Sequence, residues 1–325
     1  MDTAYTDLIQ RMAPDTRRFL LNNGHAVPAV GVGCWMGRVG EGEHVVQMVK
    51  NALEIGYRHI DTAAMYDDEV SVGQAIRESK LPREEIFITT KLAGKDHRRA
   101  SAALDRSLQK LGVEYVDLYL MHWPQAERES GEVIPPEGSP TFVDTWKDME
   151  KLVESGKARS IGVSNFSIKN LKVLLPHARI VPAVNQIEAH PCLPGHALLA
   201  FCKAHGIHVT AYAPVAKGKL GEVEDLVAIA QSKGVTVAQV LLSWGVQRGT
   251  SVIPKTENPQ RLKENISLVE LSPDDMEVLD KLHEKSGMHH SMCGFHSPAL
   301  GGSAFGWTYE QLGWDMTLGG IVKSS

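Results

Sequence analysis

The sequence predicts one (β/α)8 barrel, and three observations support this fold class. Eight short apolar segments recur along the chain, at residues 30–34, 57–61, 86–91, 116–122, 160–164, 181–186, 208–212 and 251–255. The stretches between these predicted strands carry apolar residues at helical spacing, as at 45–55 and 100–111. The 325 residues suffice for one large barrel, and no linker-like segment divides them. A doubly wound open sheet is the alternative for the same alternation.

The two ends of the chain are predicted to flank a single domain of residues 1–325. Residues 1–17 are polar, and we expect a loose N-terminal arm. Asn23-Gly24 then separates two apolar runs, which predicts a β-hairpin before the barrel. Residues 287–325 are rich in glycine, histidine and aromatic residues, so we expect a long C-terminal loop over the barrel mouth that contacts substrate.

Several helices of the predicted barrel have clear start signals. Thr236 followed by Gln239 predicts a capping box, in which each side chain bonds to the other residue's backbone amide. Further N-cap residues followed directly by proline stand at Asn258 and Ser272.

Composition excludes some partners. The formal net charge is −5, so no strong basic field attracts nucleic acid or anionic lipid. The chain contains 4 cysteines without paired spacing, which is typical of a reducing compartment. No apolar run reaches membrane-spanning length, and no signal peptide is evident. We therefore expect a cytoplasmic monomer or weak homodimer that acts on small molecules.

Ionisable side chains stand at the ends of consecutive predicted strands, where barrel enzymes build their active sites. Asp61, Lys91 and His122 end three successive strands, and Tyr66 follows in the loop after the first. One such residue is usually structural, but a series indicates a site. An ammonium group favours a phenolate, so we expect Lys91 to lower the pKa of Tyr66 from its usual value of about 10. Asp61 would compensate the burial of Lys91, and His122 would orient a substrate oxygen.

These and other motifs give the chain a family resemblance. The further motifs are Gly31-Val32-Gly33, His122-Trp123-Pro124, Gly162-Val163-Ser164-Asn165-Phe166, Asn185-Gln186-Ile187-Glu188, Tyr212-Ala213-Pro214 and Ile253-Pro254-Lys255-Thr256. The chain resembles the aldo-keto reductases from about Asn23 to about Asn265. It is most similar to the type with a short cofactor loop, as in diketogluconate reductases and fungal aldehyde reductases. The resemblance implies NADPH-dependent reduction of aldehydes or ketones, with Tyr66 as general acid.

The sequence lacks a Rossmann fingerprint, because the glycine after Gly31 and Gly33 comes one position late, at Gly37. We expect Gly33 to permit close packing. Lys255 and Arg261 flank a predicted helix start, which is a natural anion site, although single surface charges are usually only solvated.

The resemblance assigns cofactor contacts more widely. It implies contacts from Gly33, Cys34, Trp35, Asp61, Ser164, Asn165, Gln186, Tyr212, Ala213, Pro214, Val215, Lys255, Thr256, Arg261, Glu264 and Asn265. Among these, Ser164, Asn165 and Gln186 would hold the carboxamide, and Tyr212 would stack on the nicotinamide. Lys255, Thr256 and Arg261 would bind the 2′-phosphate, which favours NADPH over NADH, and Glu264 and Asn265 would bind the adenine.

Substrate contacts are expected from Trp35, Tyr66, His122 and Trp123. The chain also departs from the family pattern. Asp68 occupies a position that is often asparagine, and Ala213 replaces a common serine, for which Lys217 or Lys219 would substitute as a phosphate contact. The segment 215–225 is short, which predicts weak enclosure and easy exchange of the cofactor.

Two other functions are weighed against the reductase. An NADPH-binding regulatory subunit with the same fold would bind cofactor without turnover. A metal-dependent barrel hydrolase would need clustered histidines or carboxylates at strand ends, and none occurs in the sequence. Cys293 and His296 have ligand-like spacing, but no matching second pair follows, so we predict no metal site.

Overall fold

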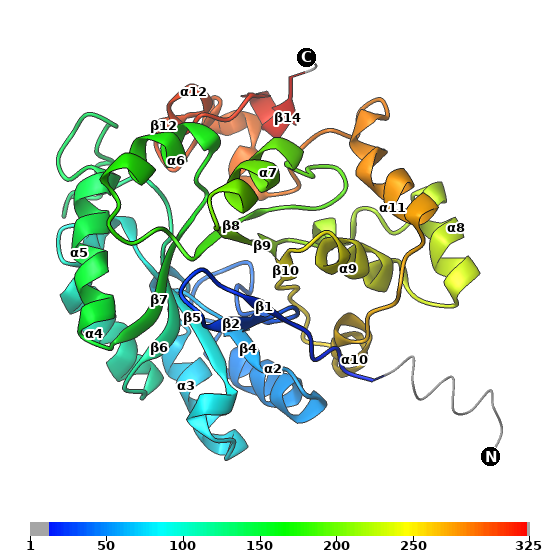
Figure 1. Ribbon diagram of the computed structural model, residues 1–325, viewed down its shortest axis with the longest axis horizontal. Coiled ribbons are helices and arrows are strands. Elements are labelled where there is room, and N and C mark those ends of the chain that lie inside the picture. Colours follow the sequence, from blue (N-terminus) through cyan, green and yellow to red (C-terminus); the bar gives the residue numbers. More distant parts are fainter. Residues whose placement is uncertain (1–12, 324–325) are drawn as a thin grey trace.

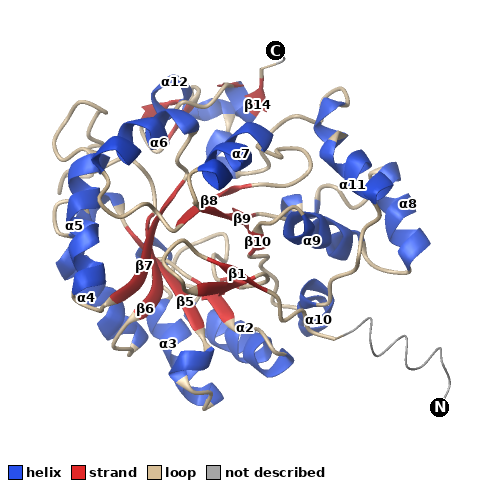
Figure 2. Ribbon diagram, in the orientation of Figure 1, coloured by secondary structure: helices blue, strands red, loops and turns tan. Residues whose placement is uncertain are grey.

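The computed structural model describes residues 13–323 and contains a parallel barrel. The strands form an 8-stranded sheet in the order β10-β9-β8-β7-β6-β5-β4-β3 (Figures 1 and 2). Their bounds are β3 (Val32–Gly33), β4 (His59–Asp61), β5 (Phe87–Leu92), β6 (Val116–Met121), β7 (Ala158–Ser164), β8 (Val184–Glu188), β9 (His208–Tyr212) and β10 (Ser251–Val252). Each strand lies near its predicted position, and the two at the seam, β3 and β10, are shorter than predicted.

The first and last strands are joined, which closes the sheet. Val30 forms a parallel bridge with Val252. The amide of Gly31 donates to the Val252 carbonyl at 2.9 Å, and the amide of Gly33 donates to the Pro254 carbonyl at 3.0 Å. A Cβ atom at Gly33 would lie 2.9 Å from the Ile253 carbonyl oxygen, so glycine permits this close approach. The predicted barrel is confirmed, and the open sheet is excluded.

Helices surround the barrel, as Figure 1 shows. Their bounds are α2 (Gly42–Ile55), α3 (Glu69–Ser79), α4 (Ala100–Leu111), α5 (Phe142–Glu154), α6 (Ile168–Leu174), α7 (His196–Ala204), α8 (Glu224–Lys233), α9 (Val237–Gln247), α10 (Pro259–Ile266), α11 (Pro273–Asp280) and α12 (Tyr309–Leu312). Short 3-10 helices are η1 (Ala64–Tyr66), η2 (Arg83–Glu85), η3 (Gly94–Asp96), η4 (Leu175–His177), η5 (Ala216–Gly218), η6 (Leu282–Glu284), η7 (Gly294–His296), η8 (Pro298–Leu300) and η9 (Leu318–Gly320).

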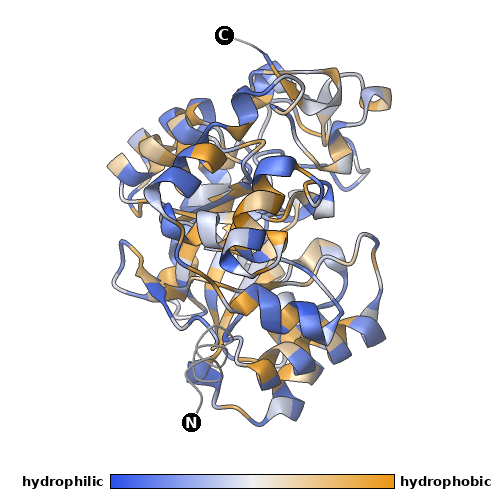
Figure 3. Ribbon diagram, turned by 90° about the vertical axis from the view of Figure 1, so that its right-hand side faces the viewer, coloured by the Kyte–Doolittle hydropathy of each residue, from blue (hydrophilic) through white to orange (hydrophobic). Residues whose placement is uncertain are grey.

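The predicted helix starts are confirmed. Thr236 and Gln239 form the capping box at α9, and Ser272 caps α11 in the same way with Asp275. Asn258 caps α10 by accepting from the amides of Gln260 and Arg261. Figure 3 shows hydrophobic and hydrophilic residues alternating along the helices, as expected for helices that pack on a sheet with one side.

The predicted hairpin closes the amino-terminal end of the barrel. Strands β1 (Arg18–Leu20) and β2 (Ala26–Pro28) pair antiparallel around Asn23-Gly24. Leu21 and Val27 pack against Phe87, Leu118 and Val184 at the base of the barrel. The other end of the barrel therefore stays available for a site.

The C-terminal segment is more ordered than predicted. We expected a long loop over residues 287–325, but the described part contains two β-hairpins and helix α12. The hairpins are β11 (Ser303–Ala304) with β12 (Trp307–Thr308) and β13 (Met316–Thr317) with β14 (Ile321–Val322). Figure 1 shows this segment, in orange to red, beside α6 and α7.

The predicted N-terminal arm lies mostly outside the described residues, because these begin at residue 13. Within the described part, the Asp15 amide donates to the Ile266 carbonyl at 2.7 Å, which attaches the chain to the end of α10. No single helix in residues 13–323 is long and apolar enough to cross a membrane. Helices α8 and α9, which are bent by 90° relative to each other, reach the required length and apolar character only when they are taken together.

Candidate active site

Asp61, Tyr66, Lys91 and His122 meet at the carboxyl end of the barrel. Asp61 ends β4, Lys91 lies in β5, His122 directly follows β6 and Tyr66 ends η1. The Lys91 Nζ atom lies 2.5 Å from Asp61 Oδ1 and 3.3 Å from Tyr66 Oη. The rings of Tyr66 and His122 pack edge to face with centroids 5.6 Å apart. The structure thus brings together all the predicted catalytic residues.

The ion pair at the centre of this group is buried and fully bonded. The Lys91 side chain has 0% exposure and that of Asp61 has 3%. Lys91 Nζ also donates to the Thr62 carbonyl oxygen at 2.9 Å, and Gln186 Nε2 donates to Asp61 Oδ2 at 2.6 Å. A buried pair needs such extra bonds to offset the loss of hydration. The contact from Thr62 was not predicted, because a backbone carbonyl gives no signal in a motif.

One expectation about Tyr66 is wrong. We expected Lys91 to bring its pKa below the usual value, but burial raises the pKa of Tyr66 to about 12. The Lys91 ammonium opposes this rise, whereas the Asp61 carboxylate adds to it. The removal of the phenol from water therefore outweighs one neighbouring cation. Tyr66 is protonated at neutral pH and is able to donate a proton.

In the ion pair, each charged group favours the charged form of the other. Burial disfavours a charged lysine, but Asp61 and Tyr66 together hold the pKa of Lys91 above its ordinary value. Burial raises the pKa of Asp61, and this rise is opposed by the bonds from Lys91 and Gln186. Loss of either partner would leave an unpaired charge in a buried site.

His122 is a neutral imidazole. Burial, together with the nearby Lys91 ammonium, lowers the pKa of His122 well below its ordinary value. Its Nδ1 atom is buried and has no hydrogen-bond partner among the described residues. A neutral imidazole carries one N–H donor, which suits it to bind an oxygen without adding charge.

The residues assigned to the nicotinamide form a network beside the catalytic group. Ser164 Oγ donates to the Gln186 carbonyl at 2.9 Å, and Asn165 Nδ2 donates to the His122 carbonyl at 3.0 Å. Tyr212 Oη donates to Asn165 Oδ1 at 2.7 Å. Gln186 links this network to the ion pair through Asp61. The structure therefore connects the predicted carboxamide contacts to the predicted catalytic residues through Gln186 and Asp61.

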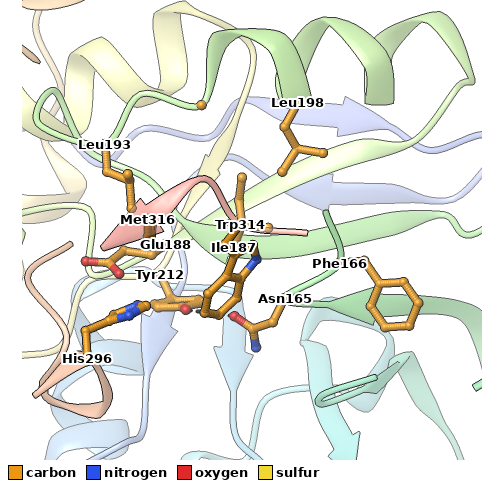
Figure 4. A pocket seen from close by; sticks show the side chains of 11 residues that line it. Asn165, Phe166, Ile187, Glu188, Leu193, Leu198, Tyr212, His296, Trp314 and Met316 are labelled. Atoms are coloured by element: carbon orange, nitrogen blue, oxygen red, sulfur yellow. Dashed lines mark hydrogen bonds between the residues drawn. The ribbon is translucent and has the colours of Figure 1, made fainter. Parts of the chain in front are cut away.

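A cavity of about 130 Å³ adjoins this network, next to Asn165 and Tyr212. Figure 4 shows Glu188 and His296 on one side of the view, Trp314 near the middle, and the apolar Leu198 above. The cavity is bounded by the ends of β7, β8 and β9, by α7 and by the C-terminal segment. A small, mainly apolar space is thus open beside the polar residues.

The loop after β9 contains the predicted contacts Ala213, Pro214 and Val215. The backbone φ angle is 49° at Ala213 and 54° at Lys217, further along the loop. A residue with a Cβ atom adopts this left-handed conformation at a cost of about 1–2 kcal/mol. The Ala216 amide donates to the Ala213 carbonyl at 2.8 Å, which closes a tight turn. Lys219, like Lys217, is exposed beyond this turn.

The predicted phosphate site lies around the start of α10. Lys255 is half-buried, Thr256 follows it, and Arg261 is exposed in the first turn of the helix. Lys255 Nζ lies 2.8 Å from Glu257 Oε1. Glu257 was not predicted as a neighbour of Lys255, and its carboxylate would compete with a phosphate for the lysine.

The predicted adenine contacts lie on the same helix. Glu264 accepts from Gln260 Nε2 at 3.0 Å, and Asn265 is buried near the helix end. The structure therefore places the two adenine residues and the phosphate residues on one short helix and the loop before it.

Trp35 and Trp123 differ in exposure. The Trp35 side of the site is open, because this residue is 41% exposed while its ring centroid lies 5.1 Å from that of Tyr66. Trp123 is buried beneath aromatic side chains of the C-terminal segment. Its ring centroid lies 5.2 Å from Phe295, 4.4 Å from Phe305 and 6.0 Å from Trp314.

The predicted contacts Gly33, which ends β3, and Cys34, which follows it, have structural roles. Gly33 packs at the closure of the barrel, as described above. Cys34 is fully buried, and its amide donates to the Asp61 carbonyl at 2.9 Å. This bond ties the end of β3 to the end of β4, next to the Asp61 carboxylate.

Glu188 attaches the C-terminal segment to the barrel. Its carboxylate accepts from Ser291 Oγ at 2.5 Å and from the Met292 amide at 2.7 Å, and lies 3.1 Å from His190 Nε2. Glu188 ends β8, so the rule that strand ends carry function could have identified it.

The four cysteines are free, and no group of three or more His, Cys, Asp or Glu side chains in residues 13–323 could hold a metal ion.

Comparison with known proteins gives a consistent result. The sequence model described as "Aldo/keto reductase family" matches residues 29–284. The chain is 44% identical over 286 residues to aldehyde reductase YPR1 of Saccharomyces cerevisiae. This alignment covers 82% of this chain and 91% of that protein. It is 42% identical over 291 residues to the glycerol 2-dehydrogenase (NADP(+)) of the same yeast, with 84% and 92% covered.

A solved structure agrees with these relatives. The Bombyx mori aldo-keto reductase AKR2E4, in complex with NADP, aligns with a TM-score of 0.77 and 37% identity. The alignment covers 82% of this chain and 92% of that chain.

Proposed function

The chain belongs to the aldo/keto reductase family, and we propose that it reduces aldehydes and ketones to alcohols with NADPH. One observation carries the proposal: Lys91 Nζ bridges the Asp61 carboxylate, at 2.5 Å, and the Tyr66 hydroxyl, at 3.3 Å. The arrangement gives a protonated phenol a cation that stabilises the phenolate left after proton donation.

The residues around the catalytic group fit a nicotinamide dinucleotide. Amide and hydroxyl groups of Ser164, Asn165 and Gln186 would hold the carboxamide, and the half-exposed Tyr212 would lie against the ring. Lys255 and Arg261 would bind the 2′-phosphate. When bound, NADPH supplies the hydride for the reduction. The yeast glycerol 2-dehydrogenase is named as NADP(+)-dependent, which supports the same cofactor for this chain.

The chain's own groups would act on the carbonyl oxygen of the substrate. Tyr66 donates its proton to that oxygen as the carbon is reduced, and Lys91 stabilises the resulting phenolate. Asp61 keeps Lys91 charged and in place. His122, as a neutral imidazole, donates a hydrogen bond to the same oxygen and so fixes the orientation of the carbonyl.

The substrate is proposed to be a small carbonyl compound that enters between Trp35 and the C-terminal segment. Trp35 is open to solvent, and Trp123 and His122 form the inner side of the site. The relative YPR1 is named an aldehyde reductase, which supports this substrate class. The free cysteines support a reducing, cytoplasmic location. We propose a monomer or weak homodimer, which light scattering at two protein concentrations would test.

The proposal is tested by following NADPH absorbance with aldehydes, ketones, keto acids and sugars. We expect turnover with at least one aldehyde, and lower KM for NADPH than for NADH. Tighter saturation by NADH would contradict the assignment of Lys255 and Arg261. Cofactor binding without any turnover would favour the regulatory-subunit alternative, which the enzyme names of the relatives do not support.

A further inference from the structure

Asp68 is a buried carboxylic acid that the proposed mechanism does not use. It is 2% exposed and occupies the N-cap position of α3. An aspartate at this position normally accepts a bond from the amides of the first helical turn. Here the side chain makes no cap bond and instead accepts from Thr62 Oγ1. Its second oxygen, Oδ2, is buried without a partner among the described residues.

Thr62 connects Asp68 to the catalytic group. The hydroxyl of Thr62 bonds to Asp68, while its carbonyl oxygen accepts from Lys91 Nζ at 2.9 Å. The Thr62 amide is fixed to the Thr89 carbonyl at 2.9 Å. One residue, Thr62, therefore contacts both Lys91 and Asp68, so the position of Asp68 is linked to that of the lysine.

Several charged or titratable groups surround Asp68. The Lys91 ammonium and the Asp61 carboxylate come from β5 and β4, and Glu69 follows Asp68 at the start of α3. The phenol of Tyr66 and the buried thiol of Cys34 also sense the charge of Asp68. Lys91 and Asp61 already balance each other, so an ionised Asp68 leaves this region with excess negative charge.

We propose that Asp68 is a positioning residue whose gain or loss of a proton changes how readily Tyr66 gives up its own. In the neutral state Asp68 holds Thr62 without adding charge near the phenol. In the ionised state it disfavours the phenolate, and so weakens Tyr66 as a proton donor. Burial raises the pKa of Asp68 to about 7, opposed by the bond from Thr62, so both states are populated near neutral pH. The inference rests on the proposed function, because it assigns Tyr66 as the donor.

The kinetic test compares wild type with Asp68→Asn, which keeps the shape of the side chain and removes its titration. In NADPH-driven reduction, wild-type kcat/KM should fall about three- to tenfold as pH rises from 6 to 8. This pH-dependent step in kcat/KM should be absent in Asp68→Asn. The control is Asp67→Asn, because Asp67 is exposed and bonds to Lys110 at 3.1 Å; it should keep the step. A step that persists in Asp68→Asn, or a flat wild-type profile, would overturn the proposal.

A further variant separates charge from position. Asp68→Ala also lacks the titration, but it leaves Thr62 Oγ1 without its acceptor. We expect Asp68→Ala to lose kcat at all pH values, and Asp68→Asn to retain it at low pH. Equal kcat in the two variants would contradict the positioning role.

Two measurements need no turnover and thus separate this inference from the proposed function. Infrared spectra should show the band of a protonated carboxyl at pH 6 that decreases by pH 8 and is absent in Asp68→Asn. After a rapid jump to alkaline pH, phenolate absorbance, with Tyr66→Phe as blank, should appear at lower pH in Asp68→Asn. If no carbonyl is reduced but both results hold, the proposed function fails and the coupling of Asp68 to Tyr66 stands. Absence of either signal overturns the coupling.

Discussion

Two lysines at strand ends of the same barrel have opposite surroundings. Lys91 has 0% side-chain exposure, and its Nζ atom contacts a carboxylate, a backbone carbonyl and a phenol. Lys255 keeps 31% exposure, and its bonded partner is the exposed Glu257. The first region is a fixed group of bonds within the protein, while the second is a set of charges that can change partners.

These opposite surroundings suit the two regions to different tasks. In the low-dielectric surroundings of Lys91, one charge strongly affects its neighbours, so the region is suited to hold and release a proton. Near Lys255, water screens the charges, and a polyanion can replace Glu257 at small cost. We therefore expect changes in the first region to affect chemistry and stability, and changes in the second to affect cofactor affinity.

The largest effect is expected for Tyr66→Phe. The variant lacks the proton donor, so turnover should fall by about 10²- to 10⁴-fold in NADPH oxidation assays. NADPH affinity, measured by fluorescence titration, should stay within about twofold, because the phenol is not among the expected cofactor contacts. Tyr115→Phe is the matched control, since Tyr115 precedes β6 at the opposite end of the barrel. Equal loss in both variants would argue against a specific role of Tyr66.

Lys91→Met should destabilise the fold, because it leaves the Asp61 carboxylate buried without its cation. Removal of one partner of a buried pair costs about 3–5 kcal/mol of unfolding free energy. Urea denaturation measures this loss. The double variant Asp61→Asn with Lys91→Met should regain part of the stability, since no charge is then unpaired. A single variant as stable as the double one would show that the pair is less coupled than its geometry indicates.

Asp68→Asn should change the pH dependence of stability. The pKa of Asp68 is about 7 in the fold, against an ordinary value of 3.8. Between these values the folded state binds more protons than the unfolded chain, so wild-type stability falls as pH rises through this window. The variant should lack this fall. Between pH 4 and pH 8, the stability of wild type should therefore drop relative to that of the variant by up to roughly 4 kcal/mol. If the unfolding free energies of wild type and variant differ by the same amount at every pH, this prediction is contradicted.

The smallest effect is expected in the exposed region. Lys255→Ala or Arg261→Ala should weaken NADPH binding by about 10- to 100-fold, because each loses a charged hydrogen bond to the 2′-phosphate. Affinity for NADH and the urea midpoint should hardly change. Lys263→Ala is the control on the same helix. If NADPH and NADH weaken equally, the two residues do not contact the 2′-phosphate.

Much of the fold followed from local signals in the chain. The Asn23-Gly24 hairpin and the capping box at Thr236 each depend on residues that are close in sequence, and the structure contains both. The C-terminal segment was predicted less well. Its hairpins are short, and its order depends on contacts such as those of Glu188 with Ser291 and Met292, which are distant in sequence.

The candidate site divides in the same way. Strand ends placed Asp61, Lys91 and His122 on one rim, because parallel strands of a barrel end at the same side. The Thr62 carbonyl and the burial of Asp68 could not be predicted, since neither has a signature in a motif.

The order of residues along the chain was enough to identify the barrel, the family and the side chains that meet at its mouth. The pKa values of those side chains follow only from the folded arrangement. The phenol of Tyr66 has a pKa raised to about 12, and the carboxyl of Asp68 one raised to about 7. The physical reason is that a pKa depends on lost hydration and on charges from other strands, and only the folded chain brings these together.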